Sequence, residues 1–206
     1  MAKKRETTAA EFMAELHADP DWVARRKAAE AELAARDAEW AKAEAPVVKA
    51  LHQVGLNVES VWDLVNTAEP YPEALPLLLD HLQRDYPDRV REGIARALAV
   101  REAKFGWRIL VDQFRRDPDT EAFGAKGGIG VALAAAADDT VMGEVIDLIR
   151  DRRHGGNRAF LIAALARSSR PEVHQVLLDL KDDDEIGYDV RKTLRLMRRK
   201  SLKNNR

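Results

Sequence analysis

Residues 71–100 of the 206-residue chain read YPEALPLLLDHLQRDYPDRVREGIARALAV. Apolar residues recur at helical intervals on both sides of the turn at 85–88, which predicts two amphipathic helices separated by a short break. Alanine, a strong helix former, contributes 33 residues to the chain, whereas aromatic residues make up only 6%. No window alternates apolar and polar residues over the length of a strand. We therefore predict an all-α fold.

Three further segments of similar design follow, at residues 101–139, 140–169 and 170–200. Aligning the second helices of the first three units brings three cations into register, each followed seven residues later by a leucine. These pairs are Arg91 and Leu98, Lys126 and Leu133, and Arg158 and Leu165. One helix pair cannot bury its own apolar face, so neighbouring pairs are expected to stack on one another.

The pattern Asp88-x-Val90-Arg91-x-x-Ile94-Ala95-x-x-Leu98 resembles the HEAT and HEAT-like (PBS lyase-type) helical repeat family, and Asp189-Val190-Arg191 is a weaker echo of it. The middle units depart from the pattern at Lys126-Gly127 and Asn157-Arg158. The resemblance implies a short α-solenoid of about four helix pairs over residues 71–200, whose second helices line a concave face. Such arrays mostly bind other proteins, and some bind nucleic acid or catalyse, as bilin lyases and alkylpurine DNA glycosylases do.

The first 56 residues differ from this array and are predicted to form a charged helical arm or cap. Asp19-Pro20-Asp21 is a helix start signal, and the run to Ala45 contains neither glycine nor proline. Pro46 is expected to kink or restart the helix. Leu33, Trp40, Val47 and Val54 form a narrow apolar stripe with a seven-residue period. Two alternatives follow: the arm packs on the protein's own next helices, or it forms a coiled-coil dimer.

Two short segments complete the expected organisation. Residues 57–70 are predicted to form a helical junction, capped by Asn57 or Ser60 and closed by the turn at 69–72. Residues 201–206 are predicted to be a basic tail.

Several kinds of chemistry have weak support in the sequence. The chain has no cysteine, which excludes disulfides and thiolate chemistry, and it has no run of 18 apolar residues or signal-peptide core, so we expect a cytoplasmic protein. The glycine cluster at 124–130 lacks the strand and the Lys-Ser/Thr pair of a phosphate loop and is expected to let helices approach closely. His81 and Asp85 lack a third metal ligand, and the acidic runs at 138–139 and 182–185 are expected to cap helices. We expect no cofactor, no metal site and no catalytic residues.

Charge is distributed unevenly along the chain. The formal net charge is -1, but residues 1–149 carry a net charge of -8 and residues 150–206 a net charge of +7. The basic part is either a face for phosphates of nucleic acid or a solvated end cap. Our leading expectation is a noncatalytic protein–protein interaction scaffold or regulatory adaptor, with nucleic-acid binding through residues 150–206 as the alternative. Oligomerisation through the N-terminal helix is a further expectation, whereas membrane binding is not expected.

Cations on the second helices and on the basic face are the candidate binding residues. They are Arg91, Arg96, Lys126, Arg152, Arg153, Arg158, Arg191 and Arg195. If these residues face a partner, substitution Arg158→Glu barely changes stability, whereas Leu98→Ala in the core costs about 2–5 kcal/mol.

Overall fold

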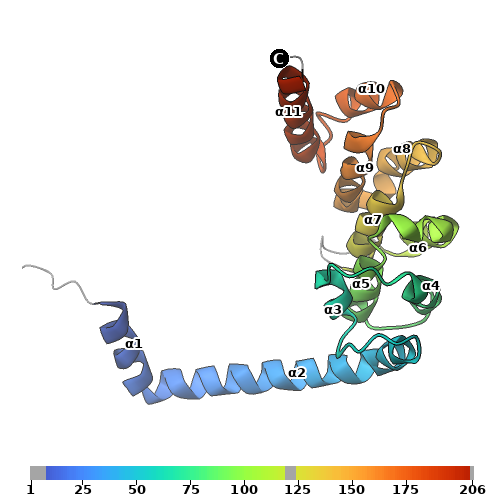
Figure 1. Cartoon of the computed structure of the whole chain (residues 1–206). Helices are drawn as coiled ribbons and strands as arrows, with labels where there is room; N and C mark the ends of the chain where they lie inside the picture. Colours follow the sequence, from blue (N-terminus) through green and yellow to red (C-terminus); the bar gives the residue numbers. More distant parts are fainter. Residues whose placement is uncertain (1–7, 119–123, 205–206) are drawn as a thin grey trace, which may run out of the picture. The chain divides into compact units, whose positions relative to one another are not determined.

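A computed structural model describes residues 8–118 and 124–204, with side chains up to residue 199 (Figure 1). Every regular element in these ranges is helical, which confirms the all-α prediction. The α-helices are α1 (Ala9–Ala18), α2 (Pro20–Gln53), α3 (Trp62–Asn66), α4 (Leu75–Leu82), α5 (Asp88–Ala97), α6 (Trp107–Arg116), α7 (Ala125–Ala136), α8 (Met142–Arg150), α9 (Ile162–Arg167), α10 (Glu172–Asp179) and α11 (Gly187–Asn204). The 3-10 helices are η1 (Pro72–Ala74), η2 (Arg101–Gly106) and η3 (Arg152–Leu161).

The chain divides into two compact units, Met1–Lys42 and Ala43–Arg206, so the division falls inside α2. The sequence-based boundary was drawn later, after residue 56. Residues Val47 and Leu51 account for the difference, because both are fully buried in the larger unit. The C-terminal helix α11 continues to Asn204, and therefore includes the first residues of the predicted tail.

The start of α2 agrees with the sequence prediction, whereas of the two effects predicted for Pro46, a kink or a restart, the restart is absent. The Asp19 carboxylate accepts the backbone N–H groups of Asp21 at 2.9 Å and Trp22 at 3.3 Å, and so caps the helix. The predicted restart at Pro46 is wrong, because the helix continues through this residue to Gln53. Proline removes one backbone donor, and the burial of Val47 in the next turn helps to hold the segment helical.

A buried carboxylate joins α2 to the predicted junction helix, which is present as α3. Glu44 of α2 accepts the Ser60 hydroxyl at 2.9 Å and the Val61 backbone N–H at 3.2 Å. The Ser60 hydroxyl oxygen in turn accepts the backbone N–H of Trp62 at 3.2 Å, as expected for one of the two predicted capping residues. These bonds satisfy backbone donors that a helix start leaves without intrahelical partners.

The remaining helices of Ala43–Arg206 pack in two rows. Figure 1 shows α4, α6, α8 and α10 on one side of the unit and α5, α7, α9 and α11 on the other. Consecutive members of the second row contact one another, and each also contacts a helix of the first row. The in-register leucines Leu98, Leu133 and Leu165 are all 0% exposed, so the expectation that Leu98 is a core residue is confirmed.

Glycine lets α7 approach α5 closely. A Cβ atom at Gly128 would lie 3.0 Å from the Glu92 carbonyl oxygen and 3.1 Å from the Cβ of Ala95. The glycine cluster at 124–130 therefore lies at the start and in the interior of the buried helix α7. Because glycine has no side chain, neighbouring residues can pack directly against the α7 backbone.

Candidate protein-binding site

Arg91, the first candidate cation, takes part in an internal ion pair. Its guanidinium donates to both carboxylate oxygens of Asp117, at 2.8 and 3.0 Å, and to Gln113 Oε1 at 3.0 Å. Asp117 directly follows α6, so the pair connects the second helix of one helix pair to the first helix of the next. Since the Arg91 side chain is only 16% exposed, little of it is available to a partner.

Arg158 repeats this arrangement two pairs later and is more deeply buried. Its side chain is 1% exposed and donates to Asp183 at 2.9 and 3.0 Å and to Glu185 at 2.6 Å. It also donates to the backbone carbonyls of Ile149 and Gly155. The hydrogen bonds from Arg158 to Asp183 lower the pKa of the Asp183 carboxyl to about 2.

The burial of Arg158 overturns the expectation that its reversal to glutamate barely changes stability. A buried charge deprived of its partners is costly, and reversal would place a carboxylate beside Asp183 and Glu185.

In the middle helix pair, Lys126 and Asp151 stand at the corresponding positions of the sequence but have different partners. Lys126 is 3% exposed and donates to the Asp117 backbone carbonyl at 2.8 Å. Asp151, 25 residues after Lys126, pairs instead with Arg153 at 2.6 Å, which lowers the pKa of the Asp151 carboxyl. The departure from the pattern that the sequence predicted for both middle units is therefore confirmed at Lys126 and wrong at Arg158, which pairs with Asp183. Lys126 is not available as a surface contact.

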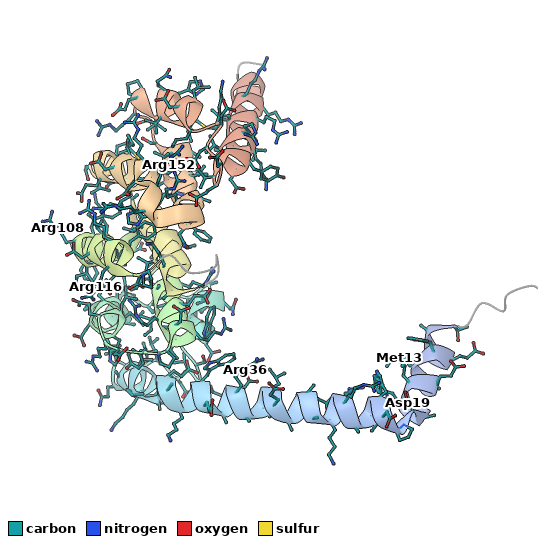
Figure 2. The ribbon with its side chains drawn as sticks, turned by 180° about the vertical axis from the view of Figure 1, so that it is seen from behind. Met13, Asp19, Arg36, Arg108, Arg116 and Arg152 are labelled. Atoms are coloured by element: carbon teal, nitrogen blue, oxygen red, sulfur yellow. The ribbon has the colours of Figure 1, made fainter. Side chains whose placement is uncertain are left out.

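The other candidate cations are accessible but dispersed. Arg152, labelled in Figure 2, is 73% exposed and Arg153 is 86% exposed, and both follow α8. Arg191 donates to the Lys181 carbonyl at 2.5 Å and Arg195 to the Arg191 carbonyl at 3.3 Å, both from α11. None of these four lines either of the two hollows described next.

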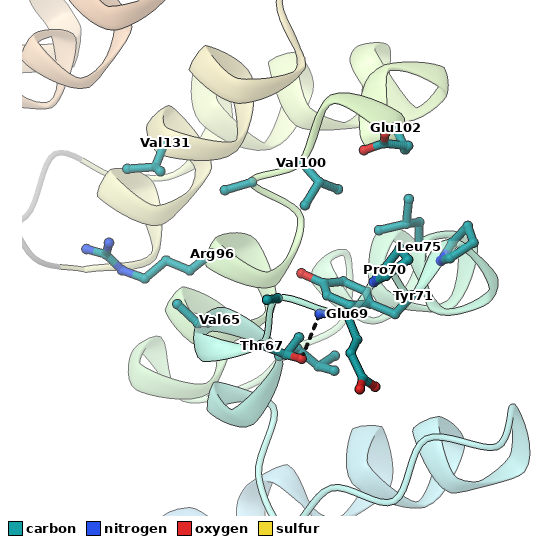
Figure 3. A pocket seen from close by; sticks show the side chains of 14 residues that line it. Val65, Thr67, Glu69, Pro70, Tyr71, Leu75, Arg96, Val100, Glu102 and Val131 are labelled. Atoms are coloured by element: carbon teal, nitrogen blue, oxygen red, sulfur yellow. Dashed lines mark hydrogen bonds between the residues drawn. The ribbon is translucent and has the colours of Figure 1, made fainter.

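The first hollow has a volume of about 460 Å³ and lies between the segment after α3 and the C-terminal end of α5 (Figure 3). Tyr71 and Leu75 lie on one side of it, and Val65 and Val131 lie on the other. The Tyr71 hydroxyl donates to the Ala97 carbonyl at 2.8 Å, which fixes the ring as part of the wall.

Arg96 is the predicted binding residue that this hollow includes. Its Nε donates to Glu92 at 2.8 Å, and its side chain is 24% exposed. Glu69 and Glu102 add two exposed carboxylates to the lining. The hollow therefore combines an apolar wall with charged groups, as ligand-binding sites do.

A second, more polar hollow of about 590 Å³ lies at the C-terminal ends of α7 and α9. Asp139 accepts the hydroxyls of Ser168 and Ser169, both at 2.5 Å, and these bonds lower the pKa of its carboxyl. Hydrogen bonds from Lys104 and Thr140 likewise lower the pKa of Asp138 to about 2. Carboxylates held ionised in this way act as hydrogen-bond acceptors and are poor general acids near neutral pH.

Neighbouring residues at the start of η2 line the two hollows, Glu102 the first and Arg101 the second. Arg101 is exposed, and its side chain makes no hydrogen bond or ion pair with any residue that the structure describes. Phe105, in the same short helix, is 64% exposed. We call the surface formed by both hollows and Arg101 the η2 edge.

No sequence pattern predicts the η2 edge. The turn Glu69-Pro70-Tyr71-Pro72 is predicted to close a helix, and in the structure it also supplies one wall of the first hollow. A tyrosine between two prolines was the available signal, because a rigid turn that holds an aromatic side chain can build a wall. Arg101 carried no motif.

Within residues 8–118 and 124–199, no group of three side chains could hold a metal ion. His81, one of the two residues considered for a metal, is buried, and its Nδ1 lies 2.7 Å from the Tyr86 hydroxyl. The helices in the described ranges also include none that is long and apolar enough to cross a membrane. Comparison of the chain with family models, curated proteins and solved structures finds no match in any of the three.

Proposed function

We propose that residues 71–200 form a HEAT-like α-solenoid that acts as a noncatalytic protein–protein interaction scaffold or adaptor. The repeated ion pairs support the HEAT-like assignment. Arg91 and Asp117 are 26 residues apart and Arg158 and Asp183 are 25 apart. The first pair joins α5 to the end of α6, and the second joins η3, which precedes α9, to the turn after α10. The absence of cysteine suits a reducing compartment, and the cytoplasm is the location that we propose.

The η2 edge is the observation that carries the binding proposal. An apolar hollow beside a polar one suits an extended peptide segment better than a single compact ligand. The apolar side chain of such a segment would enter the first hollow, and an acidic group would pair with Arg101. Apolar anchors in pockets and arginine contacts are the features that dominate protein interfaces.

This choice differs from the contact residues expected from the sequence. Arg91, Lys126 and Arg158 hold the array together, and Arg96 is the candidate that also lines a hollow. The proposed contacts are therefore Arg96 and Arg101 together with the apolar wall at Tyr71 and Val131.

A pull-down from native extract with a tagged full chain tests the proposal, with and without nuclease. Variants Arg101→Glu and Val131→Glu are compared with Arg108→Glu, which reverses an exposed arginine on α6 outside both linings (Figure 2). We expect a nuclease-resistant protein that binds the wild type and Arg108→Glu, and that is lost with the other two variants. Thermal unfolding checks that Val131→Glu is folded.

Two results would overturn this assignment. Equal recovery of the partner by all four proteins would exclude the η2 edge. Recovery of nucleic acid alone would instead favour the alternative in which residues 150–206 contact phosphates, and its binding would weaken steeply as salt rises.

A further inference from the structure

The N-terminal unit, Met1–Lys42, has no buried residue among those that the structure describes, 8–42. Phe12, Met13, Val23 and Leu33 are 54%, 44%, 42% and 47% exposed. A helix that buries nothing draws little of its stability from packing, and isolated helices are marginal in water. The arm is therefore a candidate for association with another surface.

Trp22, Ala29, Leu33 and Trp40 lie on one narrow face of α2. Trp22 and Trp40 are 18 residues apart, which is five helical turns, so they lie above one another at a separation of about 27 Å. Ala29 and Leu33, between them, deviate from that line by about 20° in opposite directions. Large residues at the ends and an Ala–Leu pair in the middle make a stripe that is similar when read in either direction.

Arginines flank this stripe without covering it. The Arg26 guanidinium lies 5.4 Å from the ring centroid of Trp22, and that of Arg36, labelled in Figure 2, lies 5.1 Å from that of Trp40. Each guanidinium lies over an indole ring in a cation–π contact. Leu33 remains 47% exposed between them.

Charge is distributed oppositely along the two halves of the stripe. Residues 20–29 contain three basic residues and one acidic residue, whereas residues 30–42 contain four acidic and two basic residues. A parallel second copy would place like-charged halves together. An antiparallel copy places each basic half against an acidic half, which favours this orientation.

We propose that the arm associates with a second copy of this chain as an antiparallel two-helix coiled coil. Trp22 packs against the partner's Trp40, and Ala29 packs against the partner's Leu33, with each layer repeated by symmetry. In this register Arg25 lies opposite the partner's Glu39, on one flank of the stripe, and the pair is repeated by symmetry. Both residues are exposed, and no ion pair within the described residues involves them. The dimer goes beyond the proposed function, because it would present two binding edges in one molecule.

Light scattering of the full chain over a wide concentration range tests the dimer directly. We expect the mass to rise from that of one 23.1 kDa chain towards twice that value. The variants Arg25→Glu and Glu39→Lys should each weaken the dimer, because like charges then face each other. Their equimolar mixture should recover the dimer. A chain that stays monomeric throughout, or a dimer that neither variant weakens, would overturn the proposal.

A second pair of variants separates the apolar face from the charges. Leu33→Lys places a charge in the stripe, whereas Ala31→Lys places it about 180° away on the same helix. Circular dichroism establishes that both remain helical. We expect dimer loss with Leu33→Lys alone, and equal effects of the two substitutions would contradict the proposed face.

Orientation is tested by cross-linking, which the absence of native cysteine makes specific. Single variants Arg25→Cys and Glu39→Cys are treated with a short bis-maleimide, separately and mixed. The antiparallel arrangement predicts cross-linked dimers mainly in the mixture. Efficient cross-linking of each variant with itself would indicate parallel helices and contradict the proposal.

Discussion

Helix α7 and the Pro20–Lys42 part of α2 are both rich in alanine, yet their surroundings are opposite. α7 has five alanines among its twelve residues and buries ten of the twelve. The α2 segment has eight alanines among 23 residues and buries none. Ten of those 23 residues are charged, against one in α7. Alanine thus accounts for the helical conformation of both, whereas glycine and charge determine which one is enclosed.

The largest expected contrast comes from charge reversal. Arg158→Glu should reduce the free energy of unfolding of the array by at least about 4 kcal/mol, because it leaves Asp183 without its partner and adds a third carboxylate. Arg25→Glu, on the exposed arm, should change it by less than about 0.5 kcal/mol. Urea unfolding followed by circular dichroism measures both.

A small effect of Arg158→Glu would break the comparison, since it would mean that the guanidinium is not held inside the array. Lys192→Glu is the control within the same unit. This residue of α11 is exposed, makes no ion pair with any described residue, and its reversal should cost little.

Truncation of a leucine should give the next largest contrast. Leu98→Ala removes a fully buried side chain next to α7 and should cost about 2–5 kcal/mol. Leu33→Ala on the arm should leave the unfolding midpoint of the array unchanged, since that side chain is 47% exposed. Similar losses in the two variants would show that the arm and the array unfold as one cooperative unit.

The sequence predicted what depends on local pattern and missed what depends on partners distant in the chain. The helix pairs, the Asp19 cap and the buried leucines follow from periodicity and capping chemistry, which act over a few residues. Arg158 was misjudged because its main partner, Asp183, lies 25 residues away, and an isolated arginine in a sequence gives no sign of burial. The η2 edge was missed for the same reason, since its walls come from four separate segments.

Adding a side chain to a small residue tests the role of glycine in the comparison. Gly128→Leu should cost roughly 1–3 kcal/mol, because even a Cβ would lie 3.0 Å from the backbone carbonyl of Glu92, which cannot move without shifting α5. Ala31→Leu adds three carbons to an exposed position of the arm and should leave the array unchanged. A stable, unshifted Gly128→Leu protein would show that α5 and α7 are less closely packed than the structure indicates.

The smallest expected contrast is in the dependence of stability on pH. Hydrogen bonds from Arg158, with smaller contributions from the backbone N–H groups of Ile186 and Glu185, lower the pKa of Asp183 from 3.8 to about 2. The unfolded chain therefore binds a proton on this group more readily than the folded one. The stabilisation that ionised Asp183 contributes is complete above about pH 4 and is lost as the pH falls towards 2.

Asp183→Asn should lower the free energy of unfolding at pH 5 and make it fall less steeply between about pH 4 and pH 2. Urea midpoints across this range measure the slope. Asp37→Asn changes an exposed carboxylate on the arm and should leave the slope as in the wild type. The range below pH 4 is the informative one, because the two buried histidines affect stability at higher pH. Burial lowers the pKa of His81 and His154, so the free energy of unfolding begins to fall on their account as the pH drops below about 6.5. An unchanged slope in Asp183→Asn would mean that the aspartate is not paired with Arg158. The most deeply buried ion pair of the array would then behave like an exposed charge on the arm.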